Sequence, residues 1–369
     1  MSGTSAPPEA LARAGVVAPR PPPPRAPKPL WRSLFGDALS TVISVLGFAG
    51  LATLLPRLLS WAVVHGVWTG GAEACREGGA CWVFLRAKAR LILFGIYPPD
   101  QQWRPMAAIL IILGLTLWSL APSRWNFRTL AAWVLGAGLA LLLMSGGVLG
   151  LEPEPTSAWG GLPITLLLTL LSLAFGFPMA VALALGRRSE MPVVRWLSVG
   201  TIELVRGLPL VTILFVASIL LPIMLPDGVD IDNLARALAA LTVFSAAYIA
   251  EVLRGGLQGV PIGQVEAARA LGMSWWGTTR RVVLPQAIGK VIPALTNTVV
   301  VIVKNTSLVL VVGLFDLLSA GRAALTDPQW PEPYVETYLF VALIYFAICF
   351  SISRYTFWLE RRPALGGAR

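Results

Sequence analysis

Charged residues are scarce in this chain: only 13% of its 369 residues are Asp, Glu, Lys or Arg. Soluble domains carry about 25%, whereas 56% of this chain is hydrophobic. The shortage of charge excludes an ordinary soluble fold. It indicates a membrane protein whose apolar helices are buried by lipid.

Histidine and cysteine are also rare. His65 is the only histidine, and no C-x2-C or H-x3-H spacing occurs, so no metal site is predicted. Cys349 lies in an apolar run, while Cys75 and Cys81 share one polar segment. Two states stay open for that pair, a disulfide in an oxidising periplasm and two free thiols.

A phosphate-binding loop is missing too. Gly289 and Lys290 lack the upstream glycine and the following hydroxyl of the G-x4-G-K-[ST] motif. No nucleophile, metal ligands or paired acids converge at one depth of the membrane, so the chain is not expected to be an enzyme.

Acidic residues are fewer than basic ones, 19 against 29, which gives a formal net charge of +10. The basic residues lie in short segments between apolar runs, as the positive-inside rule describes for cytoplasmic loops. This distribution argues against nucleic-acid binding.

Eight apolar segments are long enough, or nearly so, to cross a bilayer. They cover residues 38–64, 105–121, 130–150, 162–186, 196–224, 233–254, 287–315 and 335–358. Pro209 and Pro293 interrupt the fifth and the seventh, for which tilted or bent helices are expected. A shorter apolar stretch at 91–96 is expected to lie along the membrane interface.

Loop charges predict that both termini are cytoplasmic, because arginine-rich loops alternate with loops that contain Asp and Glu. The segment 66–104 is an exception, since it holds five basic residues yet must lie outside. We expect a disordered tail rich in Pro and Arg at 1–36 and an accessory region with three spans and a long periplasmic loop at 37–155. A core at 156–362 and a short tail at 363–369 complete the chain.

One loop carries a recognisable spacing. Glu266-Ala267-Ala268 is followed after three residues by Gly272, and later by Leu284-Pro285. The loop at 258–286 is expected to form two short helices around a turn. Gly263 and Gly272 act as breakers and the proline opens the next span.

Small side chains in this loop predict a protein contact. Ala267 and Ala268 leave one side of the first helix low enough for another protein to approach closely, and Glu266 offers an anion to basic groups on it. Gly272 suits a left-handed helix end.

The spacing E-A-A-x3-G-x9-hydrophobic-x-L-P resembles the cytoplasmic coupling loop of the membrane subunits of ATP-binding-cassette (ABC) importers. The sequence from Gly161 to Arg361 is similar to polar amino-acid permeases of that type. The segments that carry this likeness are 161–188, 202–210, 248–264, 304–308 and 316–318. With its long extension, the chain is similar to the M-type permease of general L-amino-acid importers.

The resemblance implies an all-α polytopic protein of the bacterial inner membrane, with a five-helix type I ABC importer core. It implies a permease subunit that translocates polar or general L-amino acids by alternating access and binds no cofactor itself. The implied partners are two ABC ATPase subunits, which hold ATP and Mg, a second permease, and a periplasmic substrate-binding protein. A heterodimer of permeases is favoured over a homodimer.

Charged residues inside spans cost about 2.5–3.5 kcal/mol each at the bilayer centre, so they are functional candidates. Glu203 and Arg206 lie three residues apart on the fifth span, close enough for an ion pair, and Glu251 and Arg254 repeat this spacing on the sixth. For both pairs a gate or structural role is favoured over substrate contact.

Lys304 lies deep in the seventh span. Its ammonium is a candidate receptor for a substrate carboxylate. The candidate hydrogen-bonding neighbours are Asn297, Thr298, Asn305 and Thr306. An ion pair with Asp316 and a role at a subunit interface are alternatives for this lysine.

Two other functions stay open: a permease for another small solute, and a membrane scaffold or sensor that transports nothing. The residues around Glu203, Glu251 and Lys304 speak against the first, and the short ends speak against an attached signalling domain. Side-chain selectivity is expected to reside mostly in the separate binding protein.

Overall fold

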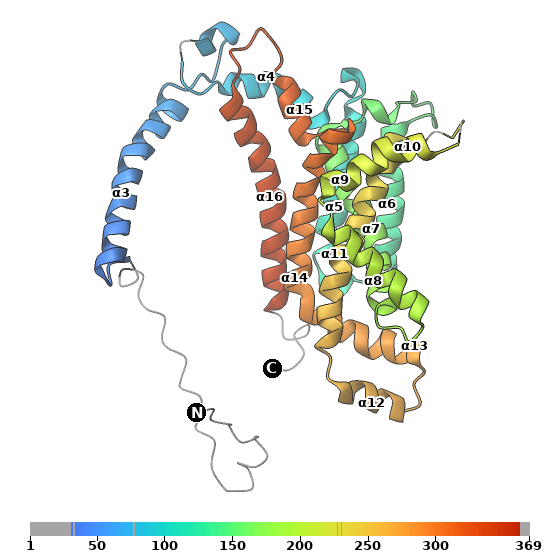
Figure 1. Cartoon of the computed structure of the whole chain (residues 1–369). Coiled ribbons are helices and arrows are strands. Elements are labelled where there is room, and N and C mark those ends of the chain that lie inside the picture. Colours follow the sequence, from blue (N-terminus) through green and yellow to red (C-terminus); the bar gives the residue numbers. More distant parts are fainter. Residues whose placement is uncertain (1–30, 32–33, 77, 227, 230, 362–369) are drawn as a thin grey trace. The chain divides into compact units, whose positions relative to one another are not determined.

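The computed structural model describes residues 31, 34–76, 78–226, 228–229 and 231–361, and is mostly helical (Figure 1). The chain divides into two compact units, residues 1–64 and 65–369. The expected boundary near residue 155 therefore falls inside the second unit. Most of the tail predicted at 1–36, and all of the tail predicted at 363–369, lie outside the described residues.

The first unit contains α3 (Ala38–Leu59), which continues into the π-helical turn η1 (Ser60–Val64). Asp37 caps the helix, because its carboxylate accepts a hydrogen bond from the Ser40 N–H at 2.8 Å. Together α3 and η1 form a segment of 27 residues that is long and apolar enough to cross a membrane.

The second unit begins with three accessory helices, α4, α5 and α6, and continues with the core from α7 onward. Its elements up to residue 160 are η2 (Ala72–Arg76), α4 (Trp82–Phe94), η3 (Pro99–Gln101), α5 (Trp103–Ser119), η4 (Pro122–Arg124), α6 (Phe127–Ser145) and η5 (Thr156–Ala158). Next come α7 (Gly161–Gly186), α8 (Pro192–Gly207), α9 (Leu210–Phe215), η6 (Val216–Leu220), α10 (Leu221–Met224) and α11 (Asn233–Gln258). The last are α12 (Ile262–Ala270), α13 (Trp275–Thr278), η7 (Thr279–Val283), α14 (Leu284–Asn305), η8 (Thr306–Val312), β1 (Phe315–Asp316), α15 (Leu317–Ala324) and α16 (Tyr334–Glu360).

Within the described residues, six helical segments are long and apolar enough to cross a membrane, or seven if α8 to α10 form one broken span. α5 accounts for the remaining predicted segment; its 17 residues are the lower limit for a crossing. The break at Leu208 and Pro209 turns the chain by 108°, more sharply than the bend that Pro209 predicted. The seventh predicted span starts earlier than expected, since helical structure runs without a gap from Trp275 to Val312.

The helices of the second unit give it two distinct ends (Figure 1). α12 and α13 mark one of them, called here the α12 end, where α16 also finishes. α4 and α15 mark the opposite end, called here the α15 end. There α4 runs across the upright helices and packs on α15 and α7. The stretch 91–96, expected along the interface, contains the end of α4.

Covalent and polar contacts tie the α15 end together. Cys75 and Cys81 form a disulfide with a Cα–Cα distance of 5.4 Å, so the disulfide alternative is the one observed. The Cys81 N–H donates to the Glu336 carboxylate at 2.6 Å. Lys88 pairs with Asp327, and this hydrogen bond holds the pKa of the Asp327 carboxyl below its usual range.

Gly161 allows an accessory helix to meet the core backbone to backbone. It has φ +67°, and a Cβ there would lie 2.3 Å from the Leu93 carbonyl oxygen of α4. Parallel bridges also join Gly160 to Phe315 and Gly161 to Asp316. Gly160 and Gly161, just after the expected boundary near residue 155, thus join the accessory helices to the core, because only glycine permits this approach.

Arg104 is the largest fully buried side chain, with 1% of its surface exposed. Its guanidinium donates to the carbonyl oxygens of Leu143 at 2.6 Å, Glu152 at 3.0 Å and Met144 at 3.3 Å, and so caps the end of α6. Tyr97 lies 5.5 Å from the guanidinium by ring centroid, and burial raises the pKa of Tyr97 to about 12.

Replacing Arg104 by Met is expected to lower the free energy of unfolding by about 2–4 kcal/mol, because the carbonyl oxygens of Leu143 and Glu152 lose a hydrogen bond from a buried guanidinium. Thermal unfolding of the detergent-solubilised protein measures the change. Arg86→Met is the control, since Arg86 is exposed on α4. Equal unfolding temperatures for the two variants would contradict this role of Arg104.

Candidate coupling helix and ion-pair cluster

The segment between α11 and α14 contains two short helices, α12 and α13, which lie at one end of the bundle (Figure 1). Pro261 occupies the N-cap of α12, where its missing N–H costs nothing. Gly263 is the second residue of this helix, so the expectation that Gly263 breaks the helix is wrong. The helix begins earlier because Pro261 presets its start, and an exposed first turn tolerates glycine.

Gly272 ends α12 as predicted. It adopts φ +76°, its N–H donates to the Arg269 carbonyl at 2.9 Å, and the Met273 N–H donates to the Ala268 carbonyl at 3.1 Å. These two bonds define a Schellman motif, which satisfies the last carbonyls of a helix and reverses the chain. Ser274 then caps α13 by accepting from the Gly277 N–H at 3.2 Å.

The small residues that form the open face of α12 are not the pair that was predicted. Gly263, Ala267 and Ala270 are exposed together with Glu266, whereas Ala268 is 4% exposed. Spacings of four and three residues place the three small residues on one side of the helix. Ala268 therefore faces the protein's own interior, and the open surface for a partner consists of Gly263, Ala267 and Ala270 beside Glu266.

A cavity of about 270 Å³ lies between α12 and the bundle. Val265 and Arg269 of α12 line one side, and Leu257 and Val283 line the other. The second short helix of the predicted loop is α13, and it is not separate from the next span: α13 continues through η7 into α14. Leu284 and Pro285 are the first two residues of α14. The short turn at residues 271–274 therefore joins α12 to a continuous helical segment that leads into α14.

Five charged side chains cluster near the α12 end, around the Glu251 carboxylate. Arg254 donates to Glu251 at 2.6 Å, and Arg187 and Arg206 each approach it at 3.5 Å. Arg187 also binds Glu203 at 2.9 Å. One carboxylate of α11 thus contacts cations that follow α7, belong to α8 and belong to α11.

The predicted Glu251–Arg254 pair is confirmed, but Glu203 does not pair with Arg206. Glu203 turns to Arg187 and Arg206 turns to Glu251. Arg187 was not among the predicted site residues, and no local spacing reveals it, because it follows α7 and reaches Glu251 through tertiary packing. The partners of Glu251 from other helices can therefore be identified only from the structure.

The ion-pair cluster adjoins a small cavity of about 170 Å³ between α11 and α14. Tyr248, Asn297 and Thr298 line it, and the Arg206 guanidinium lies 5.9 Å from the Tyr248 ring centroid. The predicted residues Asn297 and Thr298 are thereby brought next to the cluster.

α14 exposes a stripe that carries polar groups at membrane depth. Pro293, Asn297, Val301 and Lys304 recur at intervals of three or four residues and are all exposed, so they share one face. Polar groups on a membrane helix face protein or water rather than lipid. This face of α14 is therefore suited to a subunit interface or to a water-filled path.

Lys304 lines a different cavity from the one that Asn297 and Thr298 line. It lines a cavity of about 360 Å³ with Ser307, Tyr338 and Tyr345. Asn305 is half-buried at the end of α14, and Thr306 is fully buried and donates to the Val303 carbonyl at 2.7 Å. The candidate residues do not form a single pocket.

Asp316 does not pair with Lys304. It is fully buried and caps α15 by accepting from the N–H groups of Leu318 at 3.0 Å and Ser319 at 3.1 Å. Tyr345 also donates to it, at 3.2 Å. Burial raises the pKa of the Asp316 carboxyl, and the cap bonds partly offset this.

Comparison with known proteins places this arrangement in a family. Residues 172–364 match the binding-protein-dependent transport system inner membrane component family. The chain belongs to this family. It is a membrane component of a transport system, and α12 with the ion-pair cluster lies inside the matched region.

Two relatives are similar over nearly the whole chain. The inner membrane amino-acid ABC transporter permease protein YhdY of Escherichia coli (strain K12) is 44% identical over 338 residues, which cover 90% of this chain and 91% of the relative. The glutamate/glutamine/aspartate/asparagine transport system permease protein BztC of Rhodobacter capsulatus is 35% identical, with 98% and 99% covered. A solved structure of an amino acid ABC transporter with histidines is 35% identical, covers 55% of this chain and 92% of its own, and has a TM-score of 0.49.

Glu251→Gln is expected to destabilise the protein by about 1–2 kcal/mol, because three arginines lose their shared anion in a partly buried site. Glu203→Gln is the matched control and should cost less, since the Glu203 side chain is 54% exposed against 22% for Glu251. Thermal unfolding at low and high salt measures both. A larger loss for Glu203→Gln would contradict a cluster centred on Glu251.

Proposed function

We propose that this chain is the permease subunit of an ATP-driven importer that translocates L-amino acids across the inner membrane. The observation that carries the proposal is α12, a short helix with an open face of small residues, which a Schellman turn joins to α13. α13 is in turn continuous through η7 with α14. The amino-acid substrate is supported by the names of the two relatives that align over nearly the full chain.

The α12 end is the cytoplasmic end in this proposal, where two ATPase subunits that bind ATP and Mg attach. Glu266 beside the small face suits a basic groove on such a subunit. Arg188, Arg195, Arg280 and Arg281 belong to the same end, as the positive-inside rule requires. The disulfide of Cys75 and Cys81 then lies in the periplasm, where disulfides persist. A periplasmic binding protein delivers substrate to that side.

The exposed stripe of α14 lines the translocation path in this proposal, opposite a second permease subunit. Lys304 lies nearer the periplasmic side and Asn297 near the middle, while the cluster around Glu251 lies toward the cytoplasm. The ammonium of Lys304 and the guanidinium groups of the three arginines around Glu251 suit a substrate carboxylate. Because Glu251 joins three helical segments, its ion pairs are suited to an inner gate that opens by rigid-body rocking.

Gly272→Val is expected to weaken attachment of the ATPase subunits and so to reduce transport. The reason is that a β-branched residue resists the left-handed conformation and breaks the Schellman turn. Co-purified ATPase and uptake in vesicles should both fall by about tenfold, while the permease itself still inserts. Gly200→Ala is the control, since Gly200 is an exposed helical residue of α8, outside α12, and nothing lies within 4 Å of an added Cβ. Wild-type ATPase retention by Gly272→Val would count against α12 as the coupling helix.

Lys304→Met is expected to reduce amino-acid uptake by about tenfold or more while assembly with the ATPase survives, because the ammonium that receives the carboxylate is lost. Lys304→Arg keeps the charge and should restore most of the activity if charge is what matters. Uptake of a labelled amino acid into proteoliposomes measures both. Unchanged kinetics for Lys304→Met would rule out substrate contact and leave an interface role.

A further inference from the structure

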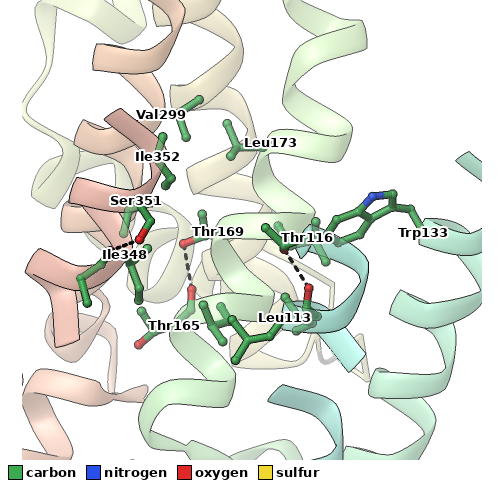
Figure 2. Close-up of a pocket in the computed structure, with 15 residues that line it drawn as sticks. Leu113, Thr116, Trp133, Thr165, Thr169, Leu173, Val299, Ile348, Ser351 and Ile352 are labelled. Atoms are coloured by element: carbon green, nitrogen blue, oxygen red, sulfur yellow. Dashed lines mark hydrogen bonds between the residues drawn. The ribbon is translucent and has the colours of Figure 1, made fainter. Parts of the chain in front are cut away.

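A cavity of about 380 Å³ separates the accessory helices from the core. Figure 2 shows Thr116 of α5 and Trp133 of α6 on one side, Ile348 and Ser351 of α16 on the other, and Thr165 of α7 between them. Leucine, isoleucine and valine side chains complete the wall. This slot is distinct from the polar face of α14 to which the transport path is assigned.

The hydroxyl groups that line the slot are all engaged within their own helices. Thr116 donates to the Ile112 carbonyl at 2.8 Å, and Thr169 donates to the Thr165 carbonyl at 2.8 Å. Ser351 donates to the Ala347 carbonyl at 2.7 Å. The Trp133 indole N–H also donates, to the Ser119 hydroxyl at 2.8 Å.

A wall of engaged hydroxyls and aliphatic groups offers no donor to a charged solute. Burying an ammonium or carboxylate in it would cost several kcal/mol without compensation. A hydrocarbon chain meets no such penalty and gains dispersion contacts with the slot. The slot is therefore suited to an aliphatic chain and excludes a zwitterionic amino acid.

One hydrogen bond closes the slot at the α12 end. The Tyr355 hydroxyl of α16 donates to the Leu120 carbonyl, just after α5, at 2.8 Å. Basic residues lie close in sequence to both partners of this bond. Arg124 of η4 and Arg128, the second residue of α6, follow Leu120 in the chain, and Arg354 precedes Tyr355 on α16.

These arginines are available to an anion. All three are exposed, and none lies within ion-pair distance of a carboxylate among the residues that the structure describes. The Arg124 guanidinium lies on the Trp118 ring, 3.9 Å from its centroid. Arginine and tryptophan together are typical of the headgroup level of a membrane.

The geometry points to a structural lipid site: an anionic phospholipid places one acyl chain in the slot between α5 and α16 and its phosphate against Arg124, Arg128 and Arg354. The lipid fills the gap that protein leaves between the accessory helices and the core. It supports the packing of α16 without entering the transport path, and this inference holds whichever solute is carried.

The test uses the full-length protein, with any subunits that co-purify, in nanodiscs that contain phosphatidylglycerol bearing a photoactivatable acyl chain. Adducts mapped by mass spectrometry are expected on α5 and α16. Ala347→Phe should reduce them by about tenfold, because a phenyl group fills the slot and removes the contacts of several methylenes. Leu343→Phe is its control, since Leu343 is 62% exposed on the same helix and does not line the slot.

A second pair of variants tests the headgroup and leaves the slot unaltered. Arg124→Gln and Arg354→Gln should each lower labelling by about fivefold, while Arg195→Gln, an exposed arginine on α8, should not. The inference is overturned if adducts are spread evenly around the bundle or if Ala347→Phe leaves them unchanged. Equal labelling by phosphatidylcholine, or a polypeptide helix recovered in the slot, would also overturn it.

Discussion

The ion pairs of the Glu251 carboxylate are the interactions on which the core depends near its α12 end. Glu251 is one of few acidic groups within the spans, and it receives Arg187, Arg206 and Arg254. A charge in this setting is stabilised only by partners, because removing it from water costs more than any single pair returns. The three arginines thereby fix how α7, α8 and α11 meet, and α11 leads directly into the α12 loop.

This arrangement explains how a chain without a phosphate-binding loop can still take part in active transport. α12 presents small side chains to solvent, and the Schellman turn joins it to the unbroken helical segment Trp275–Val312, which exposes Asn297 and Lys304. Short turns at residues 259–261 and 271–274 thus link α12 to α11, which carries Glu251, and to α14, which carries the exposed stripe. The accessory helices add a different element, an apolar slot that protein side chains leave open.

Local features of the sequence predicted local features of the structure. The left-handed turn at Gly272 and the Glu251–Arg254 pair depend on neighbours within a few residues, and both are confirmed. Gly263 was assigned as a breaker because propensity alone disfavours glycine in helices, but its position in the first turn next to Pro261 overrides that preference.

The contacts that the sequence did not reveal are those made between distant segments. Arg187 reaches Glu203 and Glu251 only because α7, α8 and α11 pack together. The segment 66–104 contradicted the expected orientation through its basic residues, yet Lys88 is paired with Asp327 and Arg104 is buried against the carbonyl groups at the end of α6. Such cations serve the fold, so they carry little information on topology.

Site-directed labelling of α12 tests the central claim that this helix is the cytoplasmic attachment point of the ATPase. Cys75 and Cys81 are joined in a disulfide and Cys349 is buried, so Ala267→Cys introduces a single accessible thiol among the described cysteines. A membrane-impermeant maleimide is expected to leave intact spheroplasts unlabelled, to modify Cys at this position in inverted vesicles stripped of ATPase, and to be blocked when the ATPase is restored. Labelling from the outside of intact spheroplasts would contradict the account.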